Sequence, residues 1–182
     1  MRRRSRLPRR ALRLRPLTRE DGPALDAVFA GMSETSRTLR FLAPVRELSS
    51  HLRDALLDLD DTRHVALVAE LHHRGTVTPI GIARYALDAA GDAEVAYEVV
   101  DAWQGHGVGR ALVEAIVRAA RTAGIQRIRA SVLRENEASL AVLRRALPQL
   151  RTDSSGDIIE VSAWLVEPPL TAADLLAELD AA

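Results

Sequence analysis

The stretch from residue 99 to residue 120, VVDAWQGHGVGRALVEAIVRAA, decides the fold, because a glycine-rich loop in it joins a strand-like segment to a helix-like one. Gly105, Gly107 and Gly109 stand at alternate positions. Glycine adopts positive φ readily and lets another molecule approach the backbone closely. Amides of such a loop, together with the dipole of the helix that follows, attract phosphate groups without needing a lysine. The loop therefore predicts an anion site between strand and helix.

Other glycine loops fit these residues less well. A Walker loop needs a lysine, and the chain has none. A dinucleotide fingerprint needs G-x-G-x-x-G and a carboxylate about 20 residues further on. Here the spacing is G-x-G-x-G, and Val132 and Leu133 occupy the expected place of the carboxylate. A tight turn with a purely structural role stays open as an alternative.

Composition predicts one compact domain, since the chain has 182 residues of which 47% are apolar. The absence of cysteine excludes disulfides, thiolate catalysis and zinc–thiolate sites. No apolar run approaches the roughly 20 residues that a membrane span needs, and the five histidines show no metal-binding pattern. Residues 1–10 are basic with no apolar segment after them, which is not typical of a secretory signal. We expect a disordered basic arm there; a nucleic-acid or acidic-surface contact is the alternative.

Hydrophobic periodicity predicts a mixed α/β sheet. An antiparallel meander is expected to lead into a strand–helix–strand unit. The expected strands are 11–16, 64–71, 79–87, 94–100, 128–132 and 158–166. The expected helices begin after Asp21, at Ser49, after the glycine loop and at Asn136, and segment 33–42 is less regular.

The segment Gln104-Gly-His-Gly107-Val-Gly109 resembles the Q/R-x-x-G-x-G/A signature of the GCN5-related N-acetyltransferase (GNAT) superfamily. The acidic strand EVAYEVV precedes it, and a helix, the strand IRASVL and Asn136-Glu-Ala-Ser139 follow in the order that the family shows. Segment 33–49 and Asp101-Ala-Trp-Gln-Gly further resemble bacterial domains of the protein-lysine acetyltransferase type. The resemblance implies a mostly antiparallel central sheet, splayed at a bulge and flanked by helices.

Two carboxylates stand out on the strand before the loop. An amine must lose its proton before it attacks a thioester, because an alkylammonium with a pKa of about 10.4 is not nucleophilic. Strand alternation places Glu94, Ala96 and Glu98 on one face. The resemblance implies that Glu94 is the general base, and Glu98 is the alternative. The remaining interpretation is that both are surface carboxylates paired with arginine.

The resemblance also implies a site for acetyl-CoA as cosubstrate. Backbone groups at the end of the strand would hold the pantetheine arm of the coenzyme. The Gln104 side chain and the loop amides would bind its diphosphate, and Asn136 and Ser139 would lie near the arm. The candidate set is Val99, Val100, Gln104, Gly105, His106, Gly107, Val108, Gly109, Arg110, Asn136 and Ser139. Asn136 also fits a helix N-cap. The sequence departs from many relatives at Leu143, where they carry a tyrosine as general acid, and at Leu147-Pro148, where they carry Gly-Phe.

We therefore expect an N-acetyltransferase domain over 11–167, between the basic arm 1–10 and a C-terminal tail helix over 168–182. The expected reaction moves an acetyl group from acetyl-CoA directly to a primary amine, which is a protein lysine or a small molecule. A non-catalytic acyl-CoA sensor is the alternative. We expect a cytoplasmic protein with no metal and no membrane or nucleic-acid partner, and a homodimer is left open.

Overall fold

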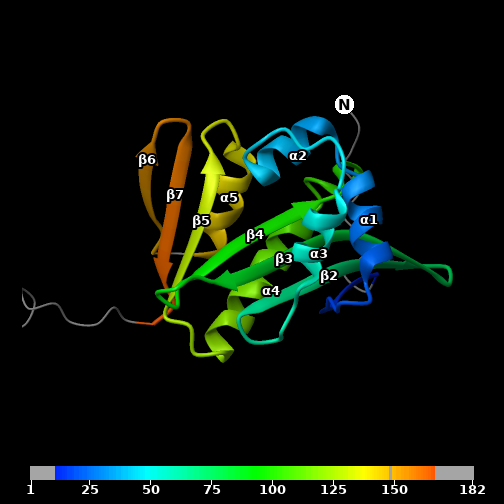
Figure 1. Cartoon of the computed structure of the whole chain (residues 1–182), viewed down its shortest axis with the longest axis horizontal. Coiled ribbons are helices and arrows are strands. Elements are labelled where there is room, and N and C mark those ends of the chain that lie inside the picture. Colours follow the sequence, from blue (N-terminus) through cyan, green and yellow to red (C-terminus); the bar gives the residue numbers. More distant parts are fainter. Residues whose placement is uncertain (1–10, 148, 167–182) are drawn as a thin grey trace, which may run out of the picture.

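The computed structural model describes residues 11–147 and 149–166. It contains one seven-stranded sheet in the order β1-β2-β3-β4-β5-β7-β6 (Figure 1). The strands are β1 (Leu12–Pro16), β2 (His64–His73), β3 (Thr76–Leu87), β4 (Ala93–Val99), β5 (Arg127–Leu133), β6 (Arg151–Ser155) and β7 (Ile158–Trp164). The helices are α1 (Gly22–Ala30), α2 (Glu34–Phe41), α3 (Ser50–Leu57), α4 (Val108–Thr122) and α5 (Glu137–Ala146), with a short 3₁₀ turn, η1, at Asp101–Trp103.

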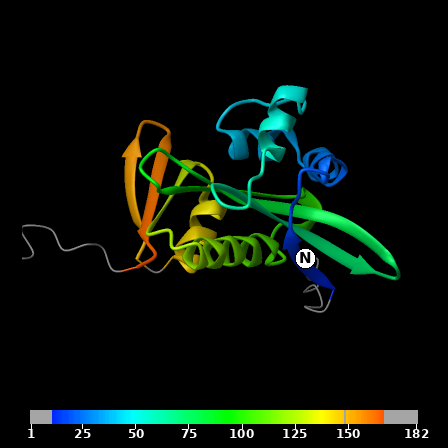
Figure 2. The same ribbon diagram turned by 60° about the horizontal axis from the view of Figure 1, so that its bottom comes forward.

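Helices cover the sheet on both faces. Helices α1, α2 and α3 lie on one side, and α4 and α5 lie on the other (Figure 2). The α4 side holds the larger core, in which Leu112 and Ile116 of α4 are fully buried against Val95 and Ile128 of the sheet. The α1–α3 side holds a second cluster around Val28. The predicted mixed α/β class and the mostly antiparallel sheet are confirmed.

The sheet opens in its middle, between β4 and β5. These two strands are the parallel pair, and they are in register only at Ala93 with Ile128 and Glu94 with Arg129. Beyond Glu94 they separate, so the two strands form a V whose closed end lies at Glu94. The predicted splay is thus present.

The register shift does not lie on β4, contrary to what the resemblance implied. The β3–β4 ladder is regular from Gly81 opposite Val99 to Leu87 opposite Ala93. The irregularity lies one ladder away, where β2 and β3 shift register at Ala69 and Glu70. The V therefore results from the end of β4–β5 pairing and not from an extra residue in β4.

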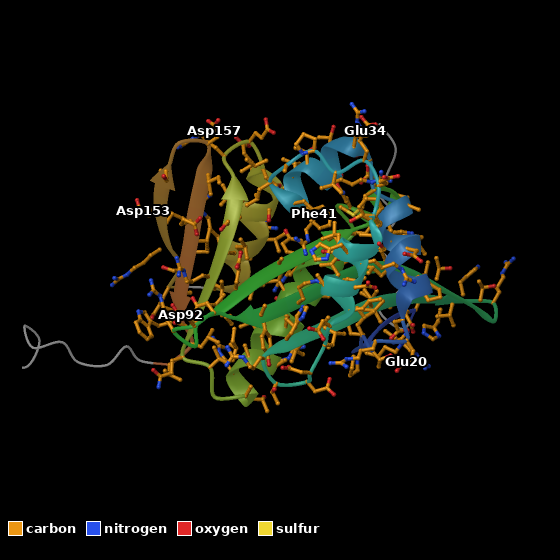
Figure 3. All side chains as sticks on the ribbon, viewed as in Figure 1. Glu20, Glu34, Phe41, Asp92, Asp153 and Asp157 are labelled. Carbon is orange, nitrogen blue, oxygen red and sulfur yellow. The ribbon has the colours of Figure 1, made fainter. Side chains whose placement is uncertain are left out.

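Two elements differ from the expected ones. Segment 33–42 contains the regular helix α2, which the Ser33 hydroxyl caps by accepting from the amide of Ser36. Residues 151–155 form β6, a strand that is not among the expected ones, and the turn that follows it contains Asp157 (Figure 3). The predicted basic arm and the predicted tail helix lie outside the described residues. In the part of the chain that is described, no helix is both long and apolar enough to cross a membrane.

Candidate active site

A cleft of about 940 Å³ occupies the V between β4 and β5. Its walls come mainly from helix α2, strand β4, the glycine loop with the start of α4, strand β5 and helix α5. The cleft therefore brings together most of the residues that the sequence predicted. Those that line it are Glu98, Val99, Gln104, Gly105, His106, Gly107, Gly109, Arg110, Asn136 and Ser139.

The glycine loop has the backbone that its sequence predicted. Gly105 and Gly107 have φ of 74° and 89°, values that side-chain-bearing residues rarely adopt. Gly107 is the N-cap of α4, which leaves the first amides of that helix without partners inside the helix. Gly109 is needed for a different reason, because a Cβ there would come within 3.0 Å of the ring of Tyr97. The loop thus presents bare backbone and a helix N-terminus to the cleft, which suits an anionic group.

The Gln104 side chain ties the loop to helix α2. Its Nε2 donates to the carbonyl of Val99 at 3.2 Å, to the hydroxyl of Ser36 at 3.2 Å and to Asp101 at 3.0 Å. Asp101 in turn accepts from the amide of Ser33 at 3.2 Å. The amide hydrogens of Gln104, predicted to take a diphosphate, therefore already have acceptors within the protein.

Glu98 lies at the open end of the V, beneath helix α2. Its side chain is 4% exposed, and its Oε2 accepts from Nε of Arg40 at 2.5 Å. Its Oε1 lies 3.6 Å from Nη2 of Arg84, whose Nη1 donates to the carbonyl of Leu56 at 2.6 Å. Figure 3 marks the neighbouring Phe41 at the end of α2. The Glu98 carboxylate is thus enclosed by two guanidinium groups.

Glu94 has the opposite surroundings. It shares a face with Glu98, as alternation predicted, but it lies at the closed end of the V and is exposed. Glu98 is four positions after Glu94, which places their α-carbons about 13 Å apart along β4. Glu94 itself does not line the cleft, although Val95 and Ala96, which follow it on β4, do. It has no ion pair or side-chain hydrogen bond among residues 11–147 and 149–166. Its carboxylate is therefore open to solvent.

Of the remaining predicted residues, one caps a helix and two lie outside the cleft lining. Asn136 caps α5, accepting from the amide of Ser139 at 3.1 Å, so its N-cap role is confirmed. Val108 is a buried core residue at the start of α4 and does not line the cleft. Val100 contributes its amide to the carbonyl of Ile80 at 3.0 Å and also lies outside the lining.

Tyr97 and Arg40 are among the cleft-lining residues that sequence reasoning missed. Tyr97 lies between the start of α4 and Ser139 on α5, where burial raises the pKa of its hydroxyl. Arg40 reaches the cleft from α2. The strand alternation signals that Tyr97 faces α4, but no pattern in the sequence signals the contact between Arg40 and Glu98.

A family model now identifies the class of protein. The model described as acetyltransferase (GNAT) domain matches residues 11–146, well over half the chain. The chain therefore belongs to the GNAT family of N-acetyltransferases. A curated relative, Acetyltransferase PA5475 of Pseudomonas aeruginosa, is 33% identical over 116 residues. That match covers 63% of this chain and 62% of the relative, so the chain spans less than two thirds of the relative's length.

Solved structures share the fold. The GNAT domain of S. lividans PAT superposes with a TM-score of 0.75 at 30% identity, over 84% of this chain and 90% of that one. The yncA protein of Salmonella typhimurium, solved with its cofactor acetyl-CoA, gives a TM-score of 0.67 at 18% identity. That match covers 90% of this chain and 99% of the other, and at this identity it shows the fold alone.

Proposed function

We propose that this protein transfers an acetyl group from acetyl-CoA directly to a primary amine while both substrates are bound. The observation that carries the proposal is the cleft between the separating strands β4 and β5, which ends at the glycine loop. A cleft that has unpaired strand backbone along its wall and a glycine loop at a helix N-terminus suits a coenzyme with a slender arm and a diphosphate. The fold shared with yncA, which was solved with acetyl-CoA, supports this choice of donor.

In this proposal the loop residues bind the coenzyme through their backbone. Amides from Gly105 to Arg110 point to the diphosphate, and the N-terminus of α4 adds partial positive charge. His106, whose Nδ1 lies 2.9 Å from the carbonyl of Gln104, lines the same end of the cleft. Backbone groups of β4 that lack a partner on β5 are available for the arm, and Val99 and Val100 contribute main chain rather than side chain. Gln104 then acts mainly by fixing the loop.

Glu94 is the general base in this proposal, and Glu98 holds the wall of the cleft. A base must have a free carboxylate that an amine, or a water between them, can reach. Glu94 suits this condition because it is exposed and directly precedes Val95 and Ala96, which line the cleft, whereas Glu98 is buried between Arg40 and Arg84. The oxyanion of the tetrahedral intermediate would be stabilised by backbone amides of β4. The coenzyme thiol has a pKa of about 8.5 by analogy with cysteine, so it leaves as a thiolate without needing a strong acid. The reaction can therefore proceed with Leu143 at the position where many relatives carry a tyrosine as general acid.

The proposed partners are acetyl-CoA and an amine acceptor, which is a protein lysine or a small molecule. The proposed location is the cytoplasm. An acyl-CoA sensor without turnover is the competing function. The free and exposed carboxylate of Glu94 favours catalysis over it, since a sensor has no use for a base beside its ligand.

The test is binding and turnover by the full chain. Calorimetry should detect CoA binding, and thiol release from acetyl-CoA should depend on added amine. Glu94→Gln should lower turnover by about 10²-fold, recover partly at high pH as more amine loses its proton in solution, and leave CoA affinity unchanged. Glu47→Gln, on an exposed carboxylate far from the cleft lining, is the matched control. CoA binding without turnover on any amine would favour the sensor, and no CoA binding would refute both.

A further inference from the structure

Three charged side chains are grouped where α2 meets the end of β4. Glu98 lies between Arg40, at 2.5 Å, and Arg84, at 3.6 Å. All three are nearly enclosed, with side-chain exposures of 12% for Arg40, 6% for Arg84 and 4% for Glu98. Two guanidinium groups share one carboxylate, so the group carries one uncompensated positive charge in a poorly solvated place.

Arg84 keeps its charge despite burial. Burial lowers its pKa to about 10, against the opposing effect of Glu98, so at neutral pH the guanidinium is still protonated. Its Nε and Nη2 have no hydrogen-bond partner in the described part of the chain. A buried cation without full compensation is costly. An anion that approached this group would lower that cost.

Arg40 is the member of the group that a ligand can reach. It lines the cleft, whereas Arg84 does not. Within the described residues its guanidinium makes one hydrogen bond, from Nε to Glu98, which leaves both Nη groups free to donate. A guanidinium fork of this kind matches the two oxygens of a carboxylate.

No other nearby carboxylate neutralises Arg40. Glu114, the other carboxylate that lines the cleft, pairs with Arg110 at 2.6 Å. Asp101 is engaged at the opposite end of α2, by the amide of Ser33 and by Gln104. Arg37, one turn before Arg40, adds positive charge, and it donates to the backbone carbonyls of Phe29 and Arg46. The charge at this wall of the cleft is therefore positive.

We propose that Arg40, held by Glu98 and backed by Arg84, is a subsite for a carboxylate carried by one of the two substrates. The carboxylate belongs either to the amine, as in an α-amino acid, or to the far end of the acyl group, as in a dicarboxylic acyl thioester. This inference rests on the proposed acyl transfer and narrows its substrates. A lysine side chain within a protein carries no carboxylate near its amine, so the subsite favours small acceptors when the acyl group is acetyl.

The first arm of the test examines the acceptor. With the full chain saturated with CoA, calorimetry measures the binding of a panel of α-amino acids and of their α-carboxamides; with acetyl-CoA, kcat/KM is measured for the same pairs. The acids and amides differ in amine pKa, but this difference cancels when the acid-to-amide ratio of a variant is compared with that of the wild type.

The second arm examines the acyl group. Calorimetry measures the binding of succinyl-CoA and butyryl-CoA, which differ in having a carboxylate or a methyl group at the end of the chain. If the carboxylate comes from the acyl group, succinyl-CoA should bind at least tenfold more tightly; if it comes from the acceptor, the two should bind alike and the amino acids should show the preference.

Three variants decide whether Arg40 is responsible. Arg40→Gln should reduce the tenfold preference to less than twofold, and Arg40→Lys should retain part of it because the charge remains while the fork is lost. Arg37→Gln is the matched control, since it loosens the same helix without touching Glu98, and it should leave the preference intact.

Either of two results would overturn the inference. One is a wild type that binds acids no better than amides and succinyl-CoA no better than butyryl-CoA. The other is a preference that Arg40→Gln leaves unchanged. In both cases CoA binding and acetyl transfer to the amides would still stand, so the proposed function survives a failure of this inference. Loss of all CoA binding would instead refute the proposed function.

Discussion

The ring of Tyr97 lies directly against the α-carbon of Gly109, so that a methyl group on Gly109 would come within 3.0 Å of Cε2 of that ring. This relationship joins the strand and the helix that border the coenzyme end of the cleft. It also explains why the third glycine of the loop is required, although it lies inside α4 and has no positive φ.

Gly109→Ala should therefore shift the Tyr97 ring and distort the loop. We expect a loss of stability of about 1–3 kcal/mol, the usual effect of overpacking, together with weaker CoA binding. Thermal unfolding and calorimetry measure the two effects. Combining Gly109→Ala with Tyr97→Leu, which removes the opposing ring atom, should give less than the sum of the single effects. Strict additivity would show that the contact is not the cause.

Glu98 and Arg40 should differ greatly in their importance for stability. Glu98→Gln leaves two buried guanidinium groups with no carboxylate, and we expect a loss of about 3–5 kcal/mol. Arg40→Gln leaves the pair of Glu98 with Arg84, so the loss should be much smaller. Urea unfolding of both variants and of the double variant measures this difference. Equal losses of stability in the two variants would mean that the guanidinium groups of Arg40 and Arg84 do not repel each other appreciably.

Acid should weaken the start of α1 through Asp21. Hydrogen bonding to Arg15, at 2.7 Å, lowers the pKa of Asp21 from 3.8 to about 2. A carboxyl whose pKa is lowered by folding stabilises the fold above its unfolded pKa, and this contribution is lost as the pH falls from about 4 to about 2. Asp21→Asn should flatten the stability profile over that range. A profile as steep as that of the wild type would contradict the assignment.

Gln104 should control the mobility of α2. Its side chain donates to Val99, Ser36 and Asp101, and thereby connects the glycine loop with the first turn of that helix. Gln104→Ala should speed amide exchange in residues 33–41 while leaving α5 unaffected, since α5 is capped independently by Asn136. Hydrogen–deuterium exchange with mass spectrometry gives the comparison. Unchanged exchange in α2 would show that the helix is held by its other contacts.

The sequence predicts the elements with strong periodicity and misses those held by tertiary contacts. Helix α4 and strand β5 appear near their expected places because each buries a regular apolar face. Helix α2 buries no residue fully, so it has no such signal; its Ser33 cap and the contacts of its arginines stabilise it. Strand β6 is exposed along its whole length and forms only because β7 pairs with it.

The same division applies to the site. The positive φ at Gly107 and the Asn136 cap follow from local residue chemistry, and both were predicted. Alternation correctly places Glu94 and Glu98 on one face, but it does not tell which one is buried. That depends on where α2 lies, and on Arg40, which is 58 residues away from Glu98 in the chain.

The early end of pairing between β4 and β5 leaves a seam inside the sheet, where most sheets expose free backbone only at their outer edges. A further protein strand has no access to this seam, because α2 spans both strands on one side and α4 packs against β4 on the other. The architecture thus exposes unpaired strand backbone to a ligand in the cleft while it protects that backbone from the aggregation that an open edge invites.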